Sequence, residues 1–289
     1  MRRFTSGPGA ATMVTVPMVL AFAYDGSLHG DWVARYALRF AAHTASRRLR
    51  VIHVTVDDEH AAAVPAGLER LATEAARIDV VVEPDLVPPG GGDVASRILD
   101  AAGRDATIVT GTRARGRALL ARTVSARLLA ARRAPVIALR VVHPGVLGQP
   151  GRALLPVMAR PGFAAAALPL LRLLAPDLER LHLVAVCAVA RLRARWQPAV
   201  ATRHLLTAAH ERLDAAEREL RAGLGAAAPP LDATVVIAAD PAHELALQTA
   251  RHRARLIALD ADAPRGAHLT PEAVLRAAPA DVAVFRTLP

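Results

Sequence analysis

The 289-residue chain contains no Lys, no Asn, a single Cys and few aromatic side chains. Apart from His, every basic side chain is therefore Arg, and the net charge of +10 is spread over both halves of the chain. This pattern indicates a compositional bias and a solvated surface, and it does not favour a nucleic-acid-binding face. Because aromatics make up only 3% of the residues, the core has to be built mainly from Ala, Leu and Val.

The single Cys187 excludes an internal disulfide and a Cys-based zinc site. It lies in the apolar run 181–189, and we interpret it as a small buried hydrophobe. No uncharged apolar run reaches the ~18 residues of a membrane-spanning helix. The run 14–24 has the length of a signal-peptide core, but Asp25 and Gly26 end it as a loop would, and no small-residue cleavage site follows. We therefore expect a first strand here, and a cytoplasmic protein.

Strand-like and helix-like segments alternate along the chain, and the order of the first half returns in the second. In the first half the strand-like runs are 19–24, 50–56, 78–82, 107–110 and 136–141, and the helical runs are 31–45, 61–77, 93–99 and 118–131. In the second half the strand-like runs are 153–158, 182–189, 231–238, 256–259 and 282–285, and the helical runs are 162–174, 199–224, 242–253 and 271–277. Apolar strands alternating with helices predict an α/β fold with parallel sheets covered on both faces. The repeated order predicts a tandem duplication.

Two segments of the first half directly follow predicted strands, at the edge where such sheets bind ligands. Asp25 follows the first strand, where its carboxylate is suited to accept a hydrogen bond from a ribose or a base. Gly111 follows the fourth strand and opens the segment 111–117, which holds two Gly, one Thr and three Arg. Small residues, backbone N–H groups and positive charge are what a phosphate requires. Ser27 is suited either to contact phosphate or to cap the next helix.

The segments Val19–Ser27, Thr107–Gly116 and Ala134–Arg140 together resemble the universal stress protein family. In that family Asp-Gly-Ser closes the first strand, and a Gly-rich turn after the fourth strand holds a nucleotide phosphate. The resemblance implies two flavodoxin-like (adenine nucleotide alpha hydrolase-like) domains, each a five-stranded parallel sheet with helices on both faces. It divides the chain into a tail at 1–17, a first domain at 18–142, a linker at 143–151 and a degenerate second domain at 152–289.

The resemblance also implies a set of nucleotide-binding residues in the first domain. They are Asp25, Gly26, Ser27, Val54, Gly111, Thr112, Arg113, Gly116, Arg122, Thr123 and Val124. The family's second Gly is replaced by Ala114 and its third by Arg122, so the Arg122 side chain is expected either to block the phosphate position or to contact a phosphate there.

The second half departs further from the family pattern. Arg160 stands near the position of the first-strand Asp, and Asp260 and Asp262 follow the fourth strand. We expect these two carboxylates to repel the phosphates of a nucleotide.

The implied function is binding and signalling in a stress response, with ATP or another adenine nucleotide in the first domain only. Neither catalysis nor a metal is expected, because the chain has no Walker loop, nucleophile elbow or HExxH. The alternative is a nucleotide-free interaction scaffold in which both sites have decayed. The two halves are expected to form an intramolecular pseudo-dimer through their fifth strands. A homodimer and an unidentified protein partner stay open, and no nucleic-acid or membrane partner is expected.

Overall fold

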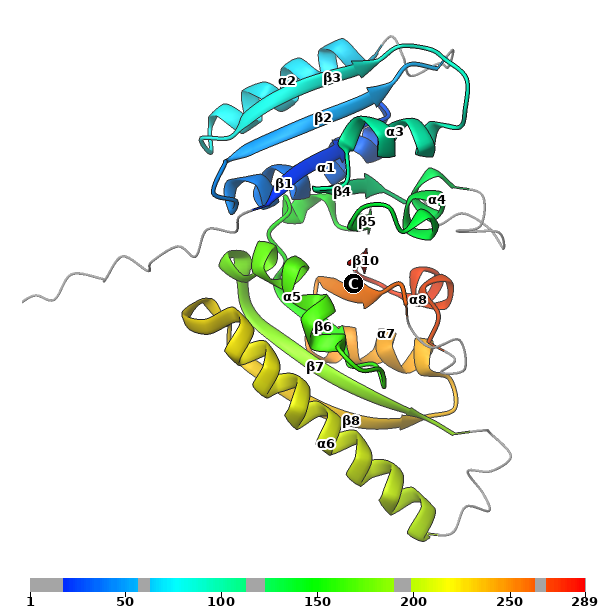
Figure 1. Cartoon of the computed structure of the whole chain (residues 1–289). Helices are drawn as coiled ribbons and strands as arrows, with labels where there is room; N and C mark the ends of the chain where they lie inside the picture. The colour runs from blue at the N-terminus through cyan, green and yellow to red at the C-terminus, as the bar shows by residue number, and fades with distance from the viewer. Residues whose placement is uncertain (1–17, 57–62, 113–122, 190–198, 263–268, 289) are drawn as a thin grey trace, which may run out of the picture.

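A computed structural model describes residues 18–56, 63–112, 123–189, 199–262 and 269–288. Its strands form one continuous 10-stranded sheet in the order β3-β2-β1-β4-β5-β10-β9-β6-β7-β8. Helices cover the sheet on both faces, and the two halves of the chain lie one beyond the other along it (Figure 1).

The elements of the first half are β1 Val19–Ala23, α1 Leu28–Ala42, β2 Arg48–Val54, α2 Val64–Ala76, β3 Val81–Val87, α3 Val94–Ala102, β4 Ala106–Gly111, α4 Val124–Ala131 and β5 Val136–Arg140. The elements of the second half are β6 Gly151–Pro156, α5 Phe163–Leu174, β7 Leu178–Ala188, α6 Ala199–Leu224, β8 Leu231–Ala238, α7 Pro241–Arg251, β9 Leu256–Asp260, α8 Pro271–Ala277 and β10 Asp281–Arg286. A short 3-10 turn, Pro144–Val146, lies between the two sets.

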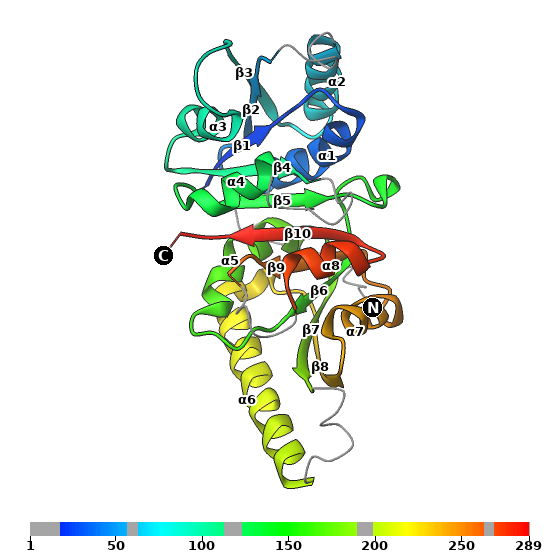
Figure 2. The same cartoon turned by 90° about the vertical axis from the view of Figure 1, so that its right-hand side faces the viewer.

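The strand order of one half repeats that of the other. The first half reads β3-β2-β1-β4-β5, and the second reads β8-β7-β6-β9-β10, with parallel pairing within each half. The predicted fold of two five-stranded parallel α/β units is therefore confirmed. The fifth strands β5 and β10 pair antiparallel and join the halves into a pseudo-dimer (Figure 2).

The strand expected at 78–82 is wrong, because β3 runs from Val81 to Val87. Only Val81 and Val82 of the expected run lie in β3; residues 78–80 form the turn after α2, where the backbone N–H groups of Ile78 and Val80 donate to Ala75 O. The sequence did not predict the full strand, because its acidic residues interrupt the apolar pattern of a buried strand. Both of them, Glu83 and Asp85, form ion pairs with Arg side chains of the neighbouring β2.

The core is built largely from aliphatic side chains, as the composition predicted. The inner strands β1, β4, β5, β9 and β10 are buried along most of their length. Aromatic side chains are few, yet Phe22, Tyr36, Phe40 and Phe285 are among the largest that are fully buried. Cys187 is buried in β7, as expected.

Two Arg side chains tie the halves together in a reciprocal way. Arg140, at the end of β5, donates to the carbonyl oxygens of Leu275 and Ala278 at the C-terminus of α8. Arg286, at the end of β10, donates to Leu129 O in α4 and to the Asp262 carboxylate. Each half thus supplies a cation to the C-terminal carbonyls of the other half's last helix, where positive charge is stabilising.

The first helix adds a second set of polar contacts across the junction. Arg39 of α1 forms an ion pair with Asp177, and His43 Nδ1 lies 2.7 Å from Leu173 O of α5. Tyr36, also on α1, donates to Asp281 Oδ2 at the start of β10 over 2.7 Å. None of the helices in the described ranges has the length and apolar character needed to cross a bilayer.

Candidate functional site

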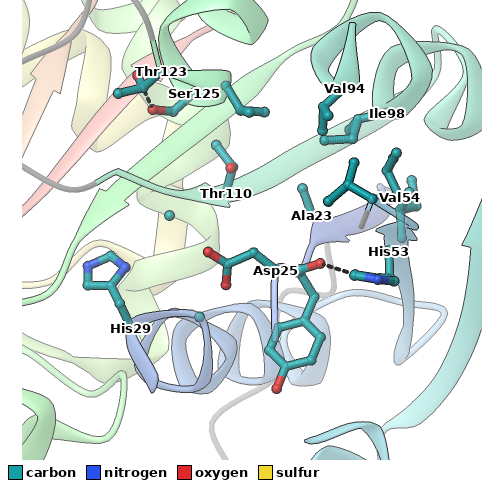
Figure 3. A pocket seen from close by; sticks show the side chains of 16 residues that line it. Ala23, Asp25, His29, His53, Val54, Val94, Ile98, Thr110, Thr123 and Ser125 are labelled. Carbon is teal, nitrogen blue, oxygen red and sulfur yellow. Dashed lines mark hydrogen bonds between the residues drawn. The ribbon is translucent and has the colours of Figure 1, made fainter. Parts of the chain in front are cut away.

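A cavity of about 340 Å³ lies at the carboxyl ends of β1, β2 and β4, where the strand order of the first half reverses. This is the place at which open α/β sheets bind ligands, and the volume lies in the ~300–1,000 Å³ range of small-molecule sites. Figure 3 shows its two sides. Polar side chains gather on one side, and aliphatic ones on the other.

The Asp25 carboxylate points into the cavity from the turn after β1 (Figure 3). Gly26 adopts a positive φ of 73°, which lets the chain turn sharply into α1. Asp25 Oδ1 accepts hydrogen bonds from the backbone N–H of Ser27 at 3.0 Å and from its hydroxyl at 2.6 Å. Gly30 permits the close packing of this turn, because a Cβ there would lie 2.6 Å from the same oxygen. The turn therefore holds the carboxylate in place before any ligand arrives.

Ser27 acts as the N-cap of α1. Its Oγ accepts from the backbone N–H of Gly30 at 3.0 Å, and the side chain is buried. Of the two roles that the sequence left open, the structure therefore assigns Ser27 to capping.

Replacing Ser27 by Ala is expected to lower the free energy of unfolding by about 1 kcal/mol, because one N–H of the first turn of α1 loses its acceptor. Urea denaturation of the purified variant measures this loss. Ser27→Thr is the control, since it keeps the hydroxyl and should retain most of the stability. An unchanged midpoint for Ser27→Ala would contradict the capping role.

The other polar wall of the cavity comes from the end of β4 and the start of α4. Gly111 is the last residue of β4, and Thr123 is the N-cap of α4, with its hydroxyl accepting from Ala126 N at 3.2 Å. Thr123 Oγ1 also lies 3.0 Å from Ser125 Oγ, and both side chains line the cavity (Figure 3). A helix N-terminus beside a Gly-ended strand is suited to bind an anion, because its backbone N–H groups and dipole favour negative charge.

The apolar wall is formed by Ala23, Val54, Val94 and Ile98, which come from β1, β2 and α3 (Figure 3). His53 closes the floor between two strands, with Nδ1 3.0 Å from Tyr24 O. The cavity is thus suited to a ligand that has a flat apolar part and a polar, anionic part.

The structure brings several of the sequence-predicted residues together. Asp25, Val54, Gly111, Thr123 and Val124 all line the cavity. Gly26, Ser27 and Thr112 do not line the cavity. Thr112 is buried, and its backbone N–H donates to Leu139 O, which continues the pairing of β4 with β5. Arg113, Gly116 and Arg122 lie outside the described residues.

The sequence did not identify several lining residues, among them His29, Val94, Ile98, Thr110 and Ser125. His29 lies at the start of the helix that Ser27 caps, and Ser125 lies two residues after the second cap, Thr123. The positions of His29 and Ser125 close to these two helix caps could have indicated from the sequence that they line the site. The contribution of α3 depends on tertiary packing, which no local pattern shows.

The second half fills the corresponding strand end with an ion pair. Asp260, the last residue of β9, is 1% exposed, and Arg160 Nε lies 2.5 Å from its Oδ2. Asp262 forms ion pairs with Arg132 and Arg286. Arg side chains therefore offset both charges, which weakens the repulsion of phosphate that the sequence predicts for these two carboxylates.

Within the described ranges, no group of three or more His, Cys, Asp or Glu side chains is arranged to hold a metal ion.

No protein-family model matches this sequence, and no curated protein matches it. Solved structures do share its fold. A universal stress protein from Archaeoglobus fulgidus superposes with a TM-score of 0.61 at 18% identity, covering 92% of this chain and 96% of that chain. A putative universal stress protein from Pseudomonas aeruginosa gives a TM-score of 0.55 at 17% identity, covering 95% and 94%.

The cytoplasmic domain of a prokaryotic cation chloride cotransporter has a similar fold, with a TM-score of 0.53 at 11% identity over 94% of this chain and 96% of that domain. The chain thus has the α/β fold of two consecutive universal-stress-type units. The sequence resemblance to universal stress proteins is confirmed at the level of the fold. Since the cotransporter domain has this fold too, the fold alone does not define a function.

Proposed function

We propose that the first-half cavity binds an adenine nucleotide such as ATP, and that the protein is a non-catalytic binding and signalling protein of the universal stress type. One observation carries the proposal: the Asp25 carboxylate, an aliphatic wall and the N-terminus of α4 meet in a single cavity at the topological switch point. The similarity to universal stress proteins supports the choice of ligand.

In this proposal the base lies against Val54, Val94 and Ile98, whose apolar surface suits a flat ring. Asp25 accepts a hydrogen bond from a ribose hydroxyl or from the base. The phosphates lie toward Gly111 and the first turn of α4, where the helix dipole favours them. The sequence between Gly111 and Thr123 is rich in Arg, a residue type that forms charge-assisted hydrogen bonds with phosphate.

We further propose that the second half binds no nucleotide. The ion pair between Arg160 and the buried Asp260 occupies the end of β9, and its disruption would leave a buried carboxylate without its partner. The proposed domain boundaries are 18–142 and 152–289. They are supported by the interval between the end of β5 at Arg140 and the start of β6 at Gly151.

Titration calorimetry with ATP is expected to give one binding event per chain. Asp25→Ala should weaken that binding by about 1–3 kcal/mol, or roughly 5–150-fold, because a hydrogen bond from the ligand to a carboxylate is lost. Asp100→Ala is the control, since Asp100 is an exposed carboxylate of α3 paired with Arg133. Mass spectrometry of molecules released on denaturing fresh protein then identifies the natural ligand.

Two equivalent ATP sites would contradict the assignment of the second half as empty. An equal loss of ATP affinity in Asp25→Ala and Asp100→Ala would show that Asp25 does not contact the nucleotide. If no nucleotide binds at all, the alternative function, a nucleotide-free interaction scaffold, takes the place of this one.

A further inference from the structure

A second pocket, of about 290 Å³, lies at the amino ends of β6, β7 and β8, whereas the first cavity lies at the carboxyl ends of β1, β2 and β4. Four Arg side chains line it: Arg152 from β6, Arg180 from β7, and Arg251 and Arg253 from the C-terminal end of α7. Because every cationic side chain other than His in this sequence is Arg, the use of Arg rather than Lys does not by itself indicate a binding site. The presence of four Arg side chains around one pocket does indicate one.

The positive charges of this pocket are only partly offset. Arg152 and Arg180 are register partners on adjacent strands, an arrangement in which like charges destabilise each other. Asp232 pairs with Arg180 at 2.7 Å, while Arg152 Nε lies 4.0 Å from the exposed Glu179. Within the part of the chain that the structure describes, neither Arg251 nor Arg253 forms an ion pair. The pocket therefore holds more positive than negative charge.

A buried histidine that lines the pocket has a ring nitrogen without a hydrogen-bond partner among the described residues. His182 is 4% exposed, its ring stacks on His252 with centroids 3.5 Å apart, and its Nε2 lies 3.0 Å from Thr234 Oγ1. Its Nδ1 is buried and has no hydrogen-bond partner among the described residues. A buried polar atom without a partner is unfavourable. The pocket is thus polar and positively charged, and it contains a buried ring nitrogen whose hydrogen bond is not made within the described ranges.

We propose that this pocket binds a small phosphate-bearing anion, at a site separate from the first-half cavity. Guanidinium groups bind phosphate oxygens through paired, charge-assisted hydrogen bonds, and several can converge on one group. An anion would relieve the repulsion between Arg152 and Arg180. Stabilisation of the α7 C-terminus is another use for cations at Arg251 and Arg253, but it does not account for the two Arg on β6 and β7.

Calorimetry with inorganic pyrophosphate tests the site. The variant Arg251→Gln/Arg253→Gln is expected to lose at least about tenfold in affinity, because two charged contacts are removed while the aliphatic stems are kept. The control is Arg203→Gln/Arg218→Gln, which changes the net charge equally on α6. Figure 2 shows α6 and α7 on opposite sides of β7 and β8. The control should bind pyrophosphate as the unsubstituted protein does.

Absence of pyrophosphate binding to the unsubstituted protein would overturn the proposal. An equal loss in both double variants would also overturn it, since it would indicate diffuse surface charge. Binding that survives in the pocket variant but is lost in Thr123→Val would place the anion at α4 instead. The test does not depend on the proposed nucleotide, because the pocket variant leaves the first-half cavity intact.

Discussion

Asp281→Ala is expected to lower the free energy of unfolding by about 3–5 kcal/mol, because a fully buried carboxylate that accepts several hydrogen bonds is removed. Asp281 is 0% exposed. Its Oδ2 accepts from the Tyr36 hydroxyl at 2.7 Å, and its Oδ1 accepts from the backbone N–H groups of Val142 and His143 at 2.6 and 2.8 Å. All three donors belong to α1 or to the chain just after β5, so one second-half side chain satisfies three groups across the junction.

Chemical denaturation with urea measures the loss, and Asp281→Asn is the matched control. The amide keeps one oxygen for the backbone N–H groups and an NH₂ group that can donate to the Tyr36 hydroxyl, so its loss should be clearly smaller. Tyr36→Phe completes a double-mutant cycle, which isolates the coupling between the two side chains. A loss below about 1 kcal/mol for Asp281→Ala would mean that water or relaxation satisfies the three donors.

The regular elements of the fold were predictable where the local pattern was strong. The helix at 199–224 follows from Leu at helical spacing, and the helix at 271–277 begins where predicted because Thr270 caps it, accepting from Ala273 N. β3 was misplaced because its charged residues pair with β2, a contact invisible from β3 alone. The reciprocal contacts of Arg140 and Arg286 depend on the register of β5 against β10 and could not be derived from either segment.

The candidate site divides in the same way. Asp25 and Gly111 were predictable because each stands at the carboxyl end of an apolar run, and carboxyl ends of parallel strands share one edge. Ser27 stayed ambiguous, since a hydroxyl after a strand serves a cap and a ligand equally well. The Arg pocket was not predictable, because its members come from β6, β7 and α7 and are far apart in sequence. What brings them together is the pairing of the strands.

Lowering the pH from 7 to 5 is expected to reduce the free energy of unfolding by about 2 kcal/mol through His182 alone. The pKa of this imidazole is lowered to about 4, first by burial and then by the neighbouring His252, Arg180 and Arg251, while Asp232 opposes the shift. In the unfolded chain the same group titrates near its ordinary value of about 6.5. Between these values the unfolded state binds the proton and the folded state does not.

Stability from this source is therefore complete above pH 6.5, falls as the pH approaches 4 and levels off below it. Urea denaturation at pH 7 and pH 5 should show that His182→Gln removes about 2 kcal/mol of the loss, because an amide facing Thr234 does not titrate. His210→Gln, on the exposed surface of α6, is the control and should keep the full loss. The same pH dependence in both variants would mean that folded and unfolded His182 take up protons alike, and that the stacked pair with His252 is well solvated.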